Sequence, residues 1–235
     1  MARSNLRLEK MRIAAEIASH IVDIVPEFLK PGMTEQNVAS IIRKHIKKRG
    51  GHKESFRMII ASGKRSAMPH GYATKKVIRK NEIVMVDIGV HYDGYCSDIT
   101  RMYHVGAKCI SPIPESDATN KIKKIYNIVK TAQLKAIKMV RSGILVSDID
   151  KAVRKEFKKY GLEKYFTHST GHGIGKMVHE EPRISHKNTK GEILETGQVI
   201  TIEPGLYFKD EFGIRIEDMI LVKKKGYEIL TETIS

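Results

Sequence analysis

The sequence is poor in cysteine and has no long apolar run. Its 235 residues include two cysteines, Cys96 and Cys109, which do not make a disulfide framework. No segment approaches the roughly 18 consecutive apolar residues of a membrane-spanning helix. The basic N-terminus lacks the apolar stretch of a signal peptide. We therefore expect a cytoplasmic protein without a membrane span, in a reducing compartment.

Tryptophan is absent, and aromatic residues make up only 6% of the chain. This is little material for a surface that stacks on nucleic-acid bases. Basic residues outnumber acidic ones by 42 to 27, which gives a formal charge of +15. The lysines are spread over several segments and form no dense tract. We expect a solvated basic surface, while a nucleic-acid binding module stays open as a second class of function.

Two helix pairs are expected, one in each half of a single domain over residues 1–235. Residues 6–30 carry apolar residues at every fourth position, and Pro31-Gly32 stops that helix. A second helix follows the N-cap residue Thr34 and ends at Gly50. Another long helix ends at Gly143, and a shorter one ends at Gly161. The halves would span about residues 6–110 and 120–235.

A constant offset relates the two pairs. Gly32 and Gly143 are 111 residues apart, as are Gly50 and Gly161. The same offset relates the apolar faces of the two shorter helices, which are Val38, Ile42 and Ile46 in the first half and Ile149, Val153 and Phe157 in the second. This spacing indicates a duplicated unit.

Acidic residues lie at corresponding places in two strand-like runs. Residues 81–90 contain Asp87, and residues 197–206 contain Glu203, each with a glycine two positions later. Asp93-Gly94 is a two-residue hairpin signal. It predicts that Asp87 opposes Thr100 and that Asp87 and Asp98 share one face of the hairpin. Two carboxylates placed so close repel each other unless a cation lies between them.

The second half offers another pair of carboxylates. Glu203 and Glu217 flank an expected hairpin around residues 209–213, whose register the sequence leaves open. Asp218 points the other way by alternation, and we interpret it as a structural or solvated acid. Between the acids of the first half and those of the second lie three histidines: His168, His172 and His179. Four carboxylates and one imidazole suit a pair of divalent cations.

Other common catalytic sites have no support in the sequence. There is no paired-cysteine spacing for structural zinc. Signatures of a serine or cysteine nucleophile and of a glycine-rich phosphate loop are also missing. The remaining histidines are interpreted as structural or solvated: His20, His45, His52, His91, His104 and His186.

The acids and histidines resemble the motifs of one known family. The segments "VDIGVHYDGYCSDITR", "HSTGHGIG", "TIEPGLY" and "GIRIED" resemble those of the pita-bread metallopeptidases, which include methionine aminopeptidase, aminopeptidase P and prolidase. The resemblance extends from about residue 6 to the end. It implies an α+β pita-bread fold with pseudo-two-fold related halves and two divalent metal ions (Mn, Co, Fe or Zn). The implied metal ligands are Asp87, Asp98, His172, Glu203 and Glu217, with Asp98 and Glu217 bridging both metals.

Further roles follow from the same resemblance. Glu203 would shuttle the proton of a hydroxide that bridges the metals. His70, in "AMPHGY", would contact the substrate or the leaving nitrogen, and His179 would stabilise the tetrahedral intermediate. His168 and Arg215 match residues of the Xaa-Pro branch with supporting or substrate-facing roles, and Arg215 has the alternative of pairing with an acid.

The resemblance favours a hydrolase of the prolidase and aminopeptidase P branch. Its substrate would be a peptide, cleaved after the N-terminal residue and preferably at an Xaa-Pro bond. The alternative is methionine aminopeptidase activity. A non-catalytic binding module and a creatinase-like hydrolase fit less well because all five metal ligands are retained. The N-terminal domain usual in Xaa-Pro peptidases is absent from this sequence, and the oligomeric state is open, with a homodimer as one option.

Overall fold

The computed structural model describes residues 2–105 and 117–233, so Cys109 lies outside the described residues. Four α-helices are described: α1 (Ala2–Phe28), α2 (Glu35–Lys48), α3 (Asp117–Met139) and α4 (Val146–Lys158). The first seven strands are β1 (Lys53–Glu54), β2 (Ile59–Ser62), β3 (Ile83–Ile88), β4 (Val90–Tyr92), β5 (Tyr95–Cys96), β6 (Ile99–His104) and β7 (Gly171–Gly173). The others are β8 (Glu180–Ile184), β9 (Val199–Ile202), β10 (Gly205–Phe208), β11 (Phe212–Arg215), β12 (Asp218–Val222) and β13 (Tyr227–Ile229). Short 3₁₀ helices span Gly63–Ala67 and Glu163–Tyr165.

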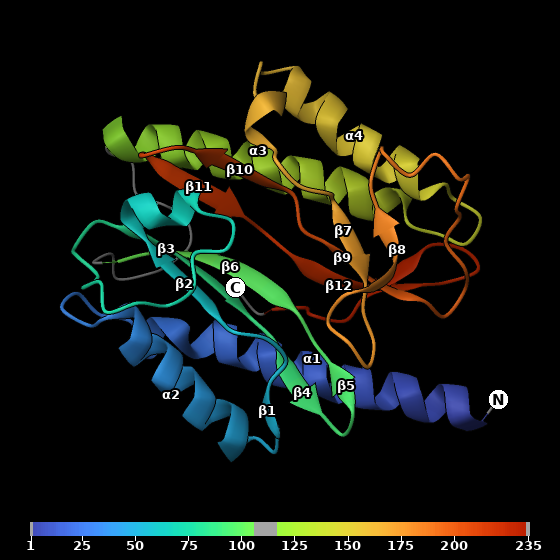
Figure 1. Cartoon of the computed structure of the whole chain (residues 1–235), viewed down its shortest axis with the longest axis horizontal. Coiled ribbons are helices and arrows are strands. Elements are labelled where there is room, and N and C mark those ends of the chain that lie inside the picture. Colours follow the sequence, from blue (N-terminus) through green and yellow to red (C-terminus); the bar gives the residue numbers. More distant parts are fainter. Residues whose placement is uncertain (1, 106–116, 234–235) are drawn as a thin grey trace.

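The strands lie between two helix pairs (Figure 1). Helices α1 and α2 pack on one side, against the sheet β2-β3-β6, and α3 and α4 pack on the other. The larger sheet has the order β13-β12-β9-β7-β8, while β1-β4-β5 and β10-β11 form smaller ones. Each half therefore has its own apolar core beneath its helix pair. In the described part of the chain, no helix combines the length and apolar content needed to cross a membrane.

Corresponding glycines end corresponding helices in the two halves. Gly32, Gly50, Gly143 and Gly161 all have φ between 68° and 90°, a backbone conformation that favours glycine. The expected helix over 6–30 is observed as α1, which starts earlier and ends at Phe28. Thr34 caps α2 as predicted, and its hydroxyl accepts a hydrogen bond from the backbone N–H of Asn37.

The hairpin of the first half has the predicted register. Tyr92 pairs with Tyr95 across the Asp93-Gly94 turn, and Asp87 pairs with Thr100 farther along. Both Asp93 and Gly94 have positive φ, as a two-residue hairpin turn requires.

The run over residues 197–206 forms two strands, whereas the sequence indicated a single one. Strand β9 pairs with β12, and β10 pairs with β11, so the chain changes partner between Ile202 and Gly205. Pro204 lies at this break because proline has no N–H to donate to a ladder. The residue numbers of each pair add up to 420 in both ladders. This register brings Glu203 and Glu217 opposite each other at the break.

A buried ion pair joins the two halves behind the acidic residues. Arg101, on β6, lies with its Nη2 atom 2.7 Å from Oδ1 of Asp218, on β12. Its Nη1 atom donates a 2.6 Å hydrogen bond to the backbone carbonyl of Glu217. Asp218 also accepts hydrogen bonds from Gln133 and Thr231, so this acid is structural and not solvated.

We expect Arg101→Met to lower the free energy of unfolding by about 3 kcal/mol, because it leaves the carboxylate of Asp218 buried without its cation. Chemical denaturation measures this change. The matched control is Arg43→Met. Arg43 pairs with Glu54 at the exposed surface, where removal of a partner costs less than about 1 kcal/mol. Equal losses in the two variants would contradict a joining role for Arg101.

Candidate metal centre

The five predicted ligands lie in or directly beside strands that meet between the halves. Asp87 is in β3, and Asp98 directly precedes β6. His172 is the central residue of β7. Glu203 directly follows β9, and Glu217 directly precedes β12. An isolated β-bridge between Thr100 and Glu217 links the strands of the two halves at this point.

Three of these side chains form a compact buried group. One ligand atom from each of Asp98, His172 and Glu217 lies within 4.8 Å of the others, and all three residues are buried. The Nε2 atom of His172 is 3.4 Å from Oε1 of Glu203 and 3.9 Å from Oδ2 of Asp98. The other ring nitrogen, Nδ1, lies 2.9 Å from the carbonyl of Gly173. Donation of Nδ1–H to this carbonyl turns the lone pair of Nε2 toward the acids.

Three carboxylate oxygens at this position have no hydrogen-bond partner among the described residues. They are Oδ1 of Asp87, Oδ1 of Asp98 and Oε1 of Glu217, and each is buried. A buried acceptor without a partner is costly, and a charged one more so. Oxygen ligands and one imidazole satisfy the preferences of divalent cations such as Mn²⁺, Fe²⁺, Co²⁺ and Zn²⁺. The residues present therefore fit a metal site.

Burial and mutual repulsion raise the pKa values of these acids. Burial, followed by the charge of Glu217, raises the pKa of Asp98 well above its usual range. Burial, followed by the charge of Glu203, does the same for Glu217. Burial raises the pKa of Glu203 to about 8. A carboxyl group with so high a pKa stays fully ionised at neutral pH only when positive charge lies beside it, and a bound cation supplies that charge.

Arg215 supplies part of that positive charge beside Asp87. The guanidinium is buried, with 3% of the residue exposed, and forms an ion pair with Asp87. It also donates to the hydroxyl of Tyr207 at 2.8 Å, to the hydroxyl of Thr100 at 3.2 Å and to the carbonyl of Pro69 at 3.2 Å. The geometry thus places Arg215 against an acid and the protein itself. Its predicted contact with substrate stays a prediction.

The predicted histidines line one cavity of about 640 Å³ beside the acids. The rings of His172 and His179 are in edge-to-face contact at 4.4 Å between centroids. His168 contacts the hydroxyl of Tyr207 through Nε2 at 2.8 Å, and burial lowers its pKa to about 4. His70 lies at the cavity mouth, where it is exposed. The structure therefore brings the acids and these histidines to a single cleft.

The sequence profile of metallopeptidase family M24 matches residues 9–224. The chain belongs to metallopeptidase family M24. An uncharacterized peptidase of Staphylococcus haemolyticus is 41% identical over 97% of this chain. This chain spans 62% of the length of that relative.

Two solved structures show the same M24 fold. The prolidase from Pyrococcus furiosus superposes with a TM-score of 0.89 at 39% identity, over 97% of this chain and 64% of the prolidase. The X-Pro aminopeptidase from Thermotoga maritima superposes with a TM-score of 0.89 at 36% identity, over 97% of this chain and 61% of that enzyme. The predicted α+β pita-bread fold is confirmed by this similarity.

Several residues of the M24 cleft were not singled out from the sequence. Tyr207 joins His168 to Arg215 through its hydroxyl. Alternation along β10 places Tyr207 on the same face as Gly205, but the break at Pro204 separates both residues from β9. The apolar wall is formed by Phe56, Ile59 and Tyr72. Ile59 lies in β2, whereas Phe56 and Tyr72 lie outside the strands, where the sequence offers no periodic signal.

We expect the free energy of unfolding of metal-free protein to fall as pH rises from about 6.5 to about 8. The pKa of Glu203 is higher in the folded protein, about 8, than its ordinary 4.5, so the unfolded chain loses its proton first. The pKa of His172 is lowered from 6.5 to about 4, so this ring affects stability only below about 6.5.

Urea denaturation at several pH values measures this dependence. Glu203→Gln should reduce the slope, and so should saturating Mn²⁺, because a bound cation offsets the acid repulsion. A slope that neither change affects would show that the acid cluster does not control stability in this pH range.

Proposed function

We propose that the cleft binds two divalent cations through Asp87, Asp98, His172, Glu203 and Glu217. The proposal rests on the buried oxygens of Asp87, Asp98 and Glu217 that have no hydrogen-bond partner among the described residues, and on the close approach of Asp98, His172 and Glu217. Bidentate and bridging carboxylates would use these free oxygens. Manganese, cobalt, iron and zinc all suit such ligands, so the metal ion is left to experiment.

The reaction that fits this site is hydrolysis of the peptide bond after the N-terminal residue. Bound cations polarise the scissile carbonyl and lower the pKa of water to near neutrality. Glu203 accepts the proton of the attacking water and passes it to the leaving nitrogen. A carboxylate held in the cleft beside the attacking water can act first as the base and then as the acid. His179 and His70, which line the cavity, donate hydrogen bonds to the developing oxyanion and to the substrate.

In this scheme, Arg215 keeps the side chain of Asp87 in position. Its ion pair with Asp87 and its hydrogen bond to Tyr207 fix two walls of the cleft. His168 continues the chain of contacts through the Tyr207 hydroxyl. We propose that Arg215 and His168 shape the substrate site mainly through Asp87 and Tyr207.

We propose Xaa-Pro peptides as the substrates. Support comes from the similarity to a prolidase and to an X-Pro aminopeptidase, and from the intact set of acids and histidines. The apolar wall would also accept an N-terminal methionine, so methionine aminopeptidase activity is the alternative.

A cytoplasmic location agrees with the low cysteine content, and Cys96 is buried as a free thiol. Nucleic acid is not an expected partner, and homodimer formation stays open.

Peptide hydrolysis by Mn²⁺- or Co²⁺-loaded protein tests the function. We expect cleavage of an Xaa-Pro dipeptide or tripeptide, loss of activity with a chelator, and recovery when the metal is restored. Asp98→Ala serves as the control, since it removes a bridging carboxylate and should lower both bound metal and turnover. Cleavage of a Met-initiated peptide alone would favour the alternative. A protein that binds metal and cleaves none of these peptides would refute the proposal.

The contribution of His179 can be separated from metal binding. We expect His179→Ala to reduce kcat roughly 10²-fold, because a donor to the oxyanion is lost, while metal content stays unchanged. Steady-state kinetics and metal analysis measure both quantities. His52→Ala is the matched control, since His52 is exposed and lies outside the cleft. A near-normal kcat in His179→Ala would limit this residue to a packing role.

A further inference from the structure

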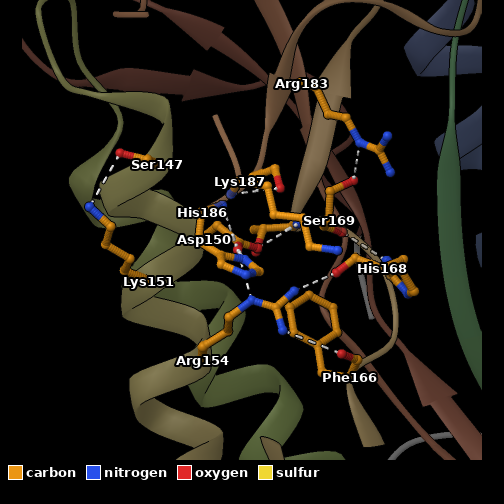
Figure 2. Close-up of polar contacts among 12 residues, drawn as sticks. Ser147, Asp150, Lys151, Arg154, Phe166, His168, Ser169, Arg183, His186 and Lys187 are labelled. Carbon is orange, nitrogen blue, oxygen red and sulfur yellow. Dashed lines mark hydrogen bonds and ion pairs between the residues drawn. The ribbon is translucent and has the colours of Figure 1, made fainter. Parts of the chain in front are cut away.

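A second cavity of about 740 Å³ opens beside the catalytic cleft. Its wall is formed by α4, by the loop before β7 and by the segment that follows β8 (Figure 2). Four residues line both cavities: His168, Ser169, Glu181 and Arg183. A substrate that fills the cleft and continues past these residues would therefore enter the second cavity.

A buried carboxylate fixes the wall of this cavity. Asp150, on α4, is fully buried and accepts hydrogen bonds from three residues. Its Oδ1 accepts from the backbone N–H and hydroxyl of Thr170, at 3.1 and 2.7 Å. Its Oδ2 accepts from Nε of Arg154 at 2.8 Å, and from the backbone N–H of His186 at 2.8 Å. The ring Nδ1 of His186 lies 2.6 Å from the same oxygen (Figure 2).

This wall is continuous with the catalytic acids. The carbonyl of Thr170 accepts a 2.7 Å hydrogen bond from the backbone N–H of Glu203. Thr170 is also two residues before His172 in the chain. Arg154 donates to the carbonyl of His168 at 2.8 Å. The second cavity is thus built on the same backbone that positions the site, and it is a fixed extension of the cleft.

Positive charge in the cavity is left without an acidic partner. The ammonium groups of Lys187 and Lys190, both exposed, form no ion pair with any acid whose side chain the structure describes. Arg183 makes one long side-chain contact, 3.4 Å from its Nε to the hydroxyl of Ser169. The guanidinium of Arg154, in contrast, is occupied by Asp150 and backbone carbonyls. Three basic side chains are therefore available to a ligand.

The acidic residues of the cavity do not cancel this charge. Glu181 accepts from the backbone N–H of Arg183, and Glu192 accepts from the side-chain amide of Asn188. Because Arg154 is paired with Asp150, the lining has three other arginine or lysine residues against two glutamates, apart from histidine. A ligand with a carboxylate is favoured here over a neutral or cationic one.

We propose that this basic pocket, formed by Arg183, His186, Lys187 and Lys190, binds the negatively charged downstream end of peptide substrates longer than a dipeptide. The inference rests on the proposed peptidase function. The pocket joins the cleft on the side of His168 and Arg183, and it has room for residues beyond a proline. A free C-terminal carboxylate would pair with the positive charges of Lys187 and Lys190.

The test compares tetrapeptides of the form Xaa-Pro-Ala-Ala with a free and an amidated C-terminus. The charge-reversed variant is Lys187→Glu/Lys190→Glu. The matched control is Lys224→Glu/Lys225→Glu, which makes the same charge change at exposed positions in the turn after β12. We expect wild-type protein to prefer the free acid about fivefold in kcat/KM at low ionic strength. The pocket variant should lose this preference, and the control should keep it.

Two further comparisons identify the origin of the effect. Cleavage of an Xaa-Pro dipeptide should change less than twofold in the pocket variant, because its carboxylate does not reach the lysines. High salt should reduce the preference of the wild type, since exposed charges are screened. An equal rate for acid and amide in wild-type protein would overturn the basic pocket while leaving the proposed peptidase function intact.

Binding measurements keep the proposal testable if turnover fails. The metal-loaded protein can then be titrated calorimetrically with the same acid and amide tetrapeptides, with and without the lysine substitutions. Tighter binding of the acid, lost with the lysine substitutions, would support the pocket even if no peptide is cleaved. Equal affinity for acid and amide would overturn it.

Discussion

Repulsion between buried carboxylates is the constraint on which this structure depends. Asp87 and Asp98 come from the first half and Glu203 and Glu217 from the second, and all four converge where little water reaches them. Desolvation is the largest cause of the raised pKa of each. A fold tolerates such a cluster only when the surrounding protein and a ligand supply compensating charge. The low-dielectric surroundings that make the acids costly also strengthen their interaction with a cation.

A different arginine supports the acids of each half. On one side, the Arg215 guanidinium faces Asp87 directly, inside the cleft. On the other side, Arg101 contacts Asp218 and the carbonyl of Glu217, behind the cleft. The first arginine offsets charge where cations would bind, and the second fixes the strand that carries Glu217. The two related halves thus carry acids at corresponding strand ends, while the arginine that supports those acids differs between the halves.

Local signals explain which parts of the fold the sequence could predict. The Asp93-Gly94 turn and the alternation of the flanking strands determine the register that pairs Asp87 with Thr100. Helix ends follow from glycines with positive φ. The break at Pro204 was not predicted, although Pro204-Gly205 interrupts the apolar run, because the change of hydrogen-bond partners involves strands later in the chain. The five proposed ligands were selected by their resemblance to family motifs, and their convergence depends on long-range pairing that no local pattern encodes.

The interpretation of His186 from the sequence was incomplete, because it missed the position of this residue in a cavity wall. As an isolated histidine it was interpreted as structural or solvated, and its pairing with Asp150 agrees with a structural role. The same ring nevertheless lines the cavity that adjoins the cleft. Asp150 is 36 residues earlier in the chain, and its hydrogen bonds to Thr170 and His186 connect that cavity wall to the backbone of Glu203. One buried acid therefore holds both the wall of the second cavity and the backbone that positions Glu203.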